Sequence, residues 1–136
     1  MASETLAQPG GGMTSGSSME RRRAPRVETR LPLSLGDRSA ELLTTTHNIS
    51  ASGAYCTVRK FLAPMTKLQV RLELPGDHRA LPIECQGVVV RVEPPEPVPR
   101  RATYRVAIFF NDLSERDRDG LVQFVQARLT ILLRRG

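Results

Sequence analysis

The sequence predicts an all-β domain with a terminal helix, built as a six-stranded antiparallel β-barrel plus a C-terminal α-helix. Between residues 31 and 110, six short stretches alternate apolar and polar residues with a period of two, and turn-forming residues separate them. After residue 114 the apolar residues recur at helical spacing instead. Short, closely spaced strands followed by one amphipathic helix favour a small barrel with the helix packed on its side or end.

The first three predicted strands occupy the first half of the barrel. Residues 31–35 alternate leucine with polar or small residues and end at a Gly-Asp turn. Residues 41–47 are rich in threonine, which favours extended structure. Residues 54–59 alternate again after a turn that contains Asn48 and Gly53.

The last three predicted strands are longer and more apolar. Residues 67–74 place leucine or valine at every second position, which is the clearest strand pattern in the chain. Residues 83–92 form another strand, and Gly87 near its middle is a candidate bulge. Four prolines within residues 93–99 lack the donor that a sheet needs, so this stretch is expected to be an exposed connection before the strand at residues 103–110.

A single helix is predicted over residues 114–134. Ser114 followed by Asp117 resembles a capping box at its start. Its apolar stripe consists of Leu121, Phe124, Val125, Leu129 and Leu132. Ile131 and Leu133 lie off this stripe, which is compatible with a protein contact or with packing at a frayed end.

The chain before the barrel divides into two parts. Residues 1–19 are rich in Gly, Ser and Thr and show no apolar periodicity, so they are expected to be a disordered tail. Residues 20–30 carry five arginines, and Pro25 argues against a helix there. We expect this arginine arm to be loose until something binds it. The folded domain is thus predicted over residues 20–136, with the barrel at 31–112.

Composition limits the function without naming it. The 136 residues carry a net charge of +6, and 18 of the 20 basic residues are arginine. Arginine presents a planar fork suited to phosphate or a guanine edge, although a GC-rich genome explains the excess equally well. No secretory signal and no membrane-spanning run is found, which predicts a cytoplasmic protein. Cys56 and Cys85 have no metal or redox spacing and are predicted to fill the core.

Two motifs lie on either side of the first predicted strand. Arg22 and Arg26 have the spacing RxxxR, and Asn48, Ser50 and Gly53 have the spacing NxSxxG. Together they resemble the RxxxR and (D/N)xSxxG signatures of the PilZ domain family. The resemblance covers about residues 20–133.

A third stretch adds to this resemblance. The strand from Tyr104 to Phe110 is similar to the family's last barrel strand, usually written YRxGxxF, with Ala107 where glycine is common. The resemblance implies the PilZ-type barrel and helix predicted above. It also implies a receptor for the second messenger cyclic di-GMP.

The arginines suit such a ligand, which carries two guanines and two phosphates. A guanidinium can bind guanine O6 and N7, stack on the purine or grip phosphate. The resemblance therefore implies that Arg22 and Arg26 bind the ligand, with Arg23 as a third contact by stacking. Arg26 and Arg30 also have RxxxR spacing, but Arg30 lies closer to the first strand than the family pattern places its second arginine.

The second motif implies the floor of the site. In the family the residue at the position of Asn48 reads the N–H edge of guanine or helps to hold the ligand, Ser50 contributes a hydroxyl, and Gly53 lets the backbone approach closely. The common family residue at position 48 is Asp, so a neutral Asn loses a charge-assisted hydrogen bond. His47 beside the turn is expected to be a partly exposed residue at a strand end.

The resulting hypothesis is a non-catalytic receptor and adaptor. It binds cyclic di-GMP, orders its arginine arm, and relays the signal to an unidentified effector protein in motility, polysaccharide or biofilm control. An alternative is a PilZ-like interaction module that no longer binds the nucleotide. A basic nucleic-acid-binding barrel is disfavoured, because six Phe and Tyr and no Trp offer little stacking surface. No catalytic, metal or cofactor motif is found, so no enzyme activity, metal or cofactor is expected.

Overall fold

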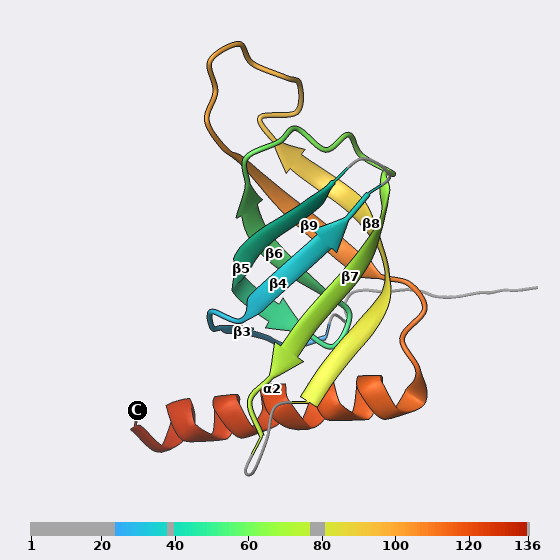
Figure 1. Ribbon diagram of the computed structural model, residues 1–136. Coiled ribbons are helices and arrows are strands. Elements are labelled where there is room, and N and C mark those ends of the chain that lie inside the picture. Colours follow the sequence, from blue (N-terminus) through green and yellow to red (C-terminus); the bar gives the residue numbers. More distant parts are fainter. Residues whose placement is uncertain (1–23, 38–39, 77–80, 136) are drawn as a thin grey trace, which may run out of the picture.

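The computed structural model describes residues 24–37, 40–76 and 81–135 (Figure 1). Seven strands precede one long helix in this part of the chain. The strands are β3 (Arg26–Glu28), β4 (Pro32–Gly36), β5 (Glu41–Ser50), β6 (Gly53–Val58), β7 (Lys67–Leu74), β8 (Leu81–Glu93) and β9 (Tyr104–Phe110), and the helix is α2 (Glu115–Arg135).

Six of the strands close into an antiparallel barrel. They follow the order β5-β4-β7-β8-β9-β6, and pairing of β6 with β5 completes the circle. The seventh strand, β3, precedes β4 in the chain and pairs with the last residues of β5. The predicted fold class is confirmed, since the barrel has six strands and one helix follows it.

Alternating side chains of the strands fill the barrel. On β7 every second residue is buried, as the sequence pattern predicts, and β9 alternates in the same way. Among the largest fully buried side chains are Leu35, Ile49, Leu72 and Ile83, which come from four different strands. Burial of this continuous apolar interior is the main stabilising contribution.

The prediction of a bulge at Gly87 is wrong. The register shift of β8 against β9 lies between Val89 and Arg91 instead. Gly87 points into the barrel, where a Cβ atom would lie 2.6 Å from Val70 Cγ2 and 2.8 Å from Ile108 Cγ2. Close packing of side chains, and not a bulge, explains glycine at this position.

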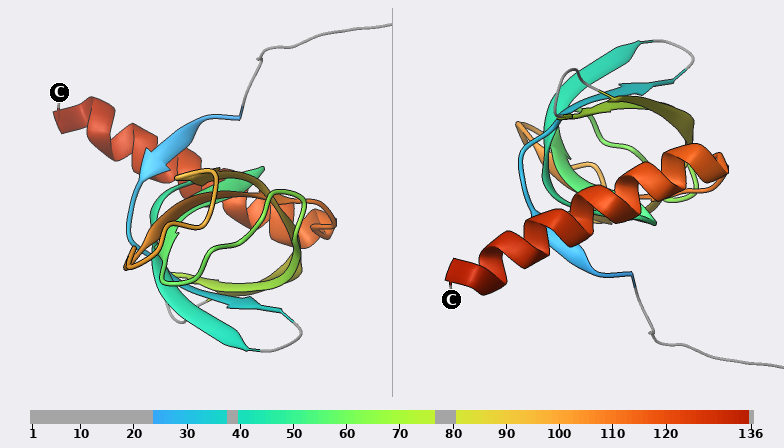
Figure 2. Two further views of the ribbon diagram at one scale, coloured as in Figure 1. Left: turned by 90° about the horizontal axis from the view of Figure 1, so that it is seen from above. Right: turned by 90° about the horizontal axis from the view of Figure 1, so that it is seen from below.

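Helix α2 lies across one end of the barrel (Figure 2). The Ser114 hydroxyl accepts a hydrogen bond from the Asp117 N–H at 3.1 Å, so the predicted cap forms. Leu121 and Val125 are buried against the barrel. The prediction that Leu132 lies on the buried stripe is wrong, because the helix continues past the barrel and leaves Leu132 55% exposed.

The two cysteines are buried and free, as predicted, and we expect them to be unreactive. Burial raises the pKa of Cys56 to about 12, and burial followed by the Asp112 and Asp117 carboxylates raises that of Cys85 to about 12. The pKa of an unfolded cysteine thiol is about 8.5. The raised pKa in the folded chain therefore gives a stabilising contribution that is fully present below that pH and is lost as the pH rises toward 12.

At pH 8 neither thiol should therefore react with an aromatic disulfide reagent until the chain is unfolded in guanidinium. Absorbance of the released thiolate measures this. Rapid labelling of the folded chain would contradict the expectation.

Candidate functional site

The site is built around β3, which the sequence did not predict. Arg26 is paired with Ser50, Val27 with Ile49 and Glu28 with Asn48, so β3 runs antiparallel along the last residues of β5. Val27 is only 3% exposed and anchors the strand in the core. The expectation of an arm that is loose through residue 30 is therefore wrong for residues 26–28.

A buried threonine fixes the chain just after β3. The Thr46 hydroxyl donates to the Thr29 carbonyl at 2.5 Å and accepts from the Leu31 N–H at 2.9 Å. The Thr46 N–H also bonds the Leu31 carbonyl at 3.0 Å. Since Thr46 is fully buried, these bonds satisfy polar groups that would otherwise destabilise the fold if left unpaired. They also hold the end of the arginine arm against β5.

One hydrogen bond joins the two sequence motifs. Arg26 Nη1 donates to Asn48 Oδ1 at 2.7 Å, between side chains on the exposed outer face of β3 and β5. The structure thus brings these two predicted site residues together. Arg22 and Arg23 lie outside the described residues.

Ser50 shapes the turn between β5 and β6. Its side chain is fully buried, and its oxygen accepts from the Ser52 N–H at 3.1 Å and lies 3.1 Å from the Ser52 hydroxyl. This pattern is a local side-chain turn of the kind that serine favours. The expected turn at Asn48 is also displaced, because β5 continues through Ser50 and the chain reverses at Ala51 and Ser52.

Gly53 is required by the barrel itself. It is buried opposite Phe109, and a Cβ atom there would lie 2.2 Å from the carbonyl oxygen of Ile108. The close backbone approach expected at this glycine is therefore made to β9 of the same chain. A backbone carbonyl cannot rotate away as a side chain can, so the position excludes every other residue unless β6 or β9 shifts.

Aromatic side chains lie beside the motif residues on the outer face. Tyr55 is paired with Asn48 across β5 and β6 and is half-buried. His47 is also half-buried, with Nε2 2.6 Å from the Thr57 hydroxyl and its ring 6.0 Å from that of Tyr55. Phe109, 46% exposed, is paired with Gly53. The sequence assigned no ligand role to Tyr55 or Phe109, although both occupy outward positions on their strands.

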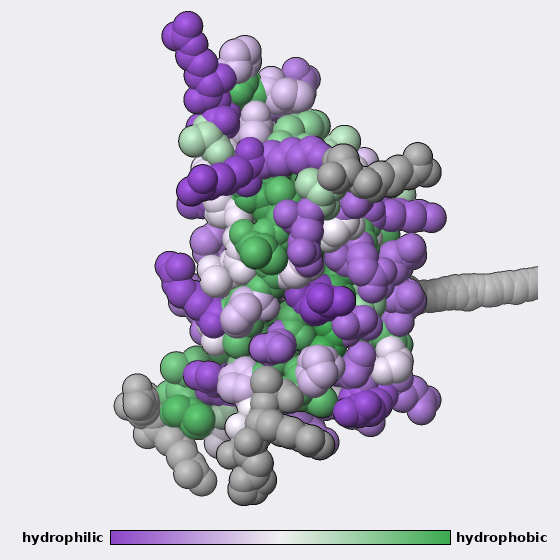
Figure 3. Space-filling view, in the orientation of Figure 1, coloured by the Kyte–Doolittle hydropathy of each residue, from purple (hydrophilic) through white to green (hydrophobic). Residues whose placement is uncertain are grey.

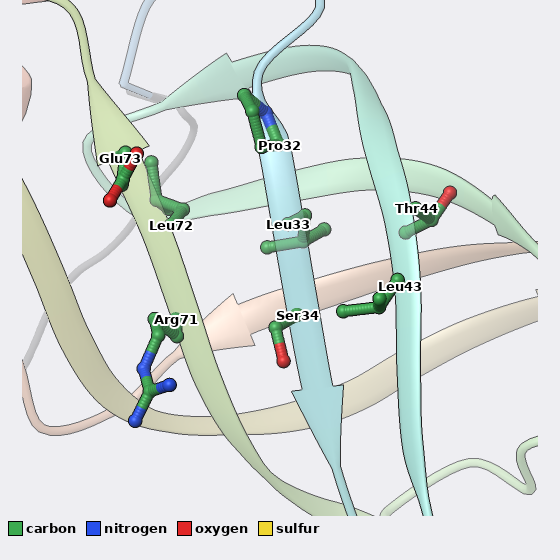
Figure 4. A pocket seen from close by; sticks show the side chains of 8 residues that line it. All are labelled: Pro32, Leu33, Ser34, Leu43, Thr44, Arg71, Leu72 and Glu73. Atoms are coloured by element: carbon green, nitrogen blue, oxygen red, sulfur yellow. The ribbon is translucent and has the colours of Figure 1, made fainter.

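The surface cavities near β5 include two that differ in character. One of about 350 Å³ is lined, among the described residues, by Glu28, Thr29, Arg30 and His47, next to Asn48. The other, of about 260 Å³, is mostly apolar and lies over β4, β5 and β7, where Leu43 reaches toward Ser34 (Figure 4). Among the described residues, none of the predicted site residues lines the second cavity.

The described part of the chain contains no group of three or more His, Cys, Asp or Glu side chains that could hold a metal ion. Within the same residues, no helix has the length and apolar character needed to cross a membrane.

The barrel, its extra strand and the paired motifs agree with a family comparison. The sequence profile of the PilZ domain matches residues 20–127. The chain belongs to the PilZ domain family. A comparison with curated proteins gave no match.

Solved structures show the same PilZ fold. The Bacillus subtilis inhibitor of motility MotI/DgrA is 22% identical, with a TM-score of 0.68 over 82% of this chain and 52% of that one. The PilZ domain of YcgR from Escherichia coli with cyclic di-GMP is 13% identical, with a TM-score of 0.59 over 79% of this chain and 91% of that one. This chain thus spans about half the length of the Bacillus subtilis protein.

Proposed function

We propose that this PilZ domain is a non-catalytic receptor for cyclic di-GMP. The hydrogen bond of 2.7 Å between Arg26 and Asn48 carries the proposal, because it places the end of one motif against the start of the other on a single exposed face. A guanidinium and an amide side by side offer donors for phosphate and guanine O6 and N7, together with an acceptor. The Escherichia coli YcgR domain of similar fold is a complex with cyclic di-GMP, which supports the same ligand here.

The ligand would lie over β3, β5 and β6 on the outer face. Arg26 would grip a phosphate or a guanine edge, and Asn48 would contact the base. Tyr55 and Phe109 would provide apolar surface against which a purine can stack. Arg22 and Arg23 would close over the ligand from the preceding segment. Ser50 and Gly53 would hold the turn and the strand beneath it, which is a supporting role.

The signal would pass from the arm to helix α2. A small cavity of about 50 Å³ separates Pro25 at the base of the arm from Val122, Val125 and Gln126 on the helix, with Ala51 beside them. A ligand that draws the arm toward Asn48 would change this packing. Ile131, Leu132 and Leu133 are 49%, 55% and 81% exposed at the far end of the same helix. Figure 3 shows an apolar patch at its lower left, where the C-terminal end of α2 lies in Figure 1, and these exposed side chains would suit contact with an effector protein.

A titration of the full chain tests the receptor proposal. Isothermal calorimetry with cyclic di-GMP is expected to show saturable binding, and the same titration reports whether one ligand or a stacked pair is bound. Cyclic di-AMP has the same phosphates without guanine and should bind at least about 10-fold more weakly, because the site's guanine contacts would be unpaired. No measurable binding of cyclic di-GMP would contradict the proposal.

A second function is an interaction module that does not bind the nucleotide. The exposed apolar end of α2 favours it, because this surface needs no ligand to be available. The calorimetric titration separates the two functions. A partner captured equally well with and without cyclic di-GMP, by a chain that gives no binding heat, would support the second.

A further inference from the structure

One acidic side chain lies directly beside the paired motif residues. Glu28 on β3 is paired with Asn48 on β5, and directly opposite residues of an antiparallel pair have Cβ atoms about 5 Å apart. Glu28 is exposed on the same outer face as Arg26, two residues earlier on the strand. Among the residues that the structure describes, its carboxylate has no hydrogen-bond or ion-pair partner.

The carboxylate lines a cavity of suitable chemistry. Glu28 and Arg30 both line the cavity of about 350 Å³, with Thr29 and His47. Guanine presents two kinds of groups in one plane, the N1–H and N2–H donors and the O6 and N7 acceptors. A carboxylate matches the donors and a guanidinium matches the acceptors. Glu28 and Arg30 therefore supply both halves of guanine recognition in one place.

Asn48 supplies this interaction less strongly. Its amide is neutral, and one lone pair of its Oδ1 already accepts from Arg26 Nη1. A hydrogen bond from guanine to an ionised carboxylate is about twice as strong as one to a neutral amide. Glu93, the acidic residue beside Tyr55, is committed to the Tyr55 hydroxyl at 3.3 Å and to Arg91 at 3.3 Å.

We propose that Glu28 reads the N1–H and N2–H edge of a guanine of the ligand, with Arg30 on the same base. This inference rests on the proposed receptor function. It makes Glu28 a residue that determines base specificity and assigns Arg30 to the ligand site. The neutral Asn48 then positions Arg26 beside its own contact with the base, and the anionic acceptor comes from the neighbouring strand.

A purely electrostatic role for Glu28 predicts the opposite change in ligand affinity. If its carboxylate only offsets the charge of Arg26 and Arg30, removing it strengthens the binding of a ligand with two phosphates. If it accepts from guanine, removing it weakens binding. Substitution of Glu28 by its amide therefore distinguishes the two roles by the direction of the change.

The experiment compares Glu28→Gln with the wild-type chain in calorimetric titrations. Cyclic di-GMP and its diinosine analogue, which lacks the N2 amino group, are the two ligands. Glu28→Gln should weaken cyclic di-GMP binding about 10-fold, the size of a charged hydrogen bond, and should reduce the preference for guanine over inosine. Glu96→Gln, the same charge change in the connection between β8 and β9, is the control and should match the wild type.

A second variant tests whether weaker binding by Glu28→Gln comes only from a loss of folding. Glu28→Gln combined with Asn48→Asp moves the carboxylate to the paired position and should recover most of the affinity. Unchanged or tighter binding by Glu28→Gln, or an unchanged inosine preference, would overturn the assignment while leaving the receptor proposal intact. No binding of cyclic di-GMP by the wild-type chain would instead overturn both.

Discussion

Replacing Gly53 with alanine is expected to destabilise the PilZ domain by about 3 kcal/mol, the upper part of the range for overpacking a tight site. The new Cβ would lie 2.2 Å from the Ile108 carbonyl oxygen and 3.4 Å from Phe109 Cα. Both contacts are with the backbone of β9, so relief requires a shift between two paired strands. Thermal unfolding followed by circular dichroism should show a decrease in the midpoint of roughly 10 °C.

Gly36→Ala is the matched control for this prediction. Gly36 lies at the end of β4, and a Cβ atom there would come no closer than 3.8 Å, to Gln69 Cβ. Neither glycine has a positive φ, so the two substitutions differ mainly in space. Gly36→Ala should change stability by less than about 0.5 kcal/mol. Equal unfolding temperatures for the two variants would show that β6 and β9 can separate at little cost.

The outcome also affects how binding data are interpreted. Gly53 comes three residues after Ser50 and directly after the turn beneath the site. If Gly53→Ala weakens binding, the loss follows from a displaced strand and not from a missing ligand contact. Binding by this variant must therefore be measured well below its unfolding temperature.

The sequence was sufficient to predict most of the barrel because each strand buries one face. Residues 67–74 show this clearly, and the predicted strand has the observed bounds. Ser114 likewise predicted the start of α2 from a local hydrogen bond. These features depend on residues close in the chain, so their pattern is visible without a fold.

Strand β3 shows what the sequence could not indicate. It has three residues and one buried side chain, Val27, which is too short for a period of two to be recognised. Its existence depends on pairing with β5 and on the bonds of Thr46 about 17 residues away. Gly87 is similar, because the sequence cannot distinguish a bulge from contact with Val70 and Ile108 on other strands.

The candidate site was likewise predictable only in part from the sequence. Arg26 and Asn48 were identified by motif, and only the register of β3 against β5 shows that they contact each other. The same register shows that Glu28 is the neighbour of Asn48. The burial of Ser50 also depends on where β5 ends, which local sequence left ambiguous.

Arg26→Ala is expected to weaken cyclic di-GMP binding about 100-fold, which corresponds to losing charged hydrogen bonds of about 1.5 to 3 kcal/mol. The substitution removes the guanidinium that donates to Asn48 Oδ1 and so alters both proposed ligand contacts together. Stability should change little, because Arg26 is exposed and Val27 anchors the strand. Calorimetry measures the affinity and thermal unfolding checks the fold.

Two further variants show what the guanidinium contributes. Arg118→Ala removes an exposed arginine from the first turns of α2, away from the motifs, and should bind as the wild type does. Arg26→Lys keeps the charge but loses the planar fork. If Arg26 contacts only phosphate, lysine should recover most of the affinity. If Arg26 holds Asn48 and a guanine edge at once, lysine should recover little, because a single ammonium group cannot satisfy two fixed directions. An Arg26→Ala chain that binds as tightly as the wild type would exclude Arg26 from the site.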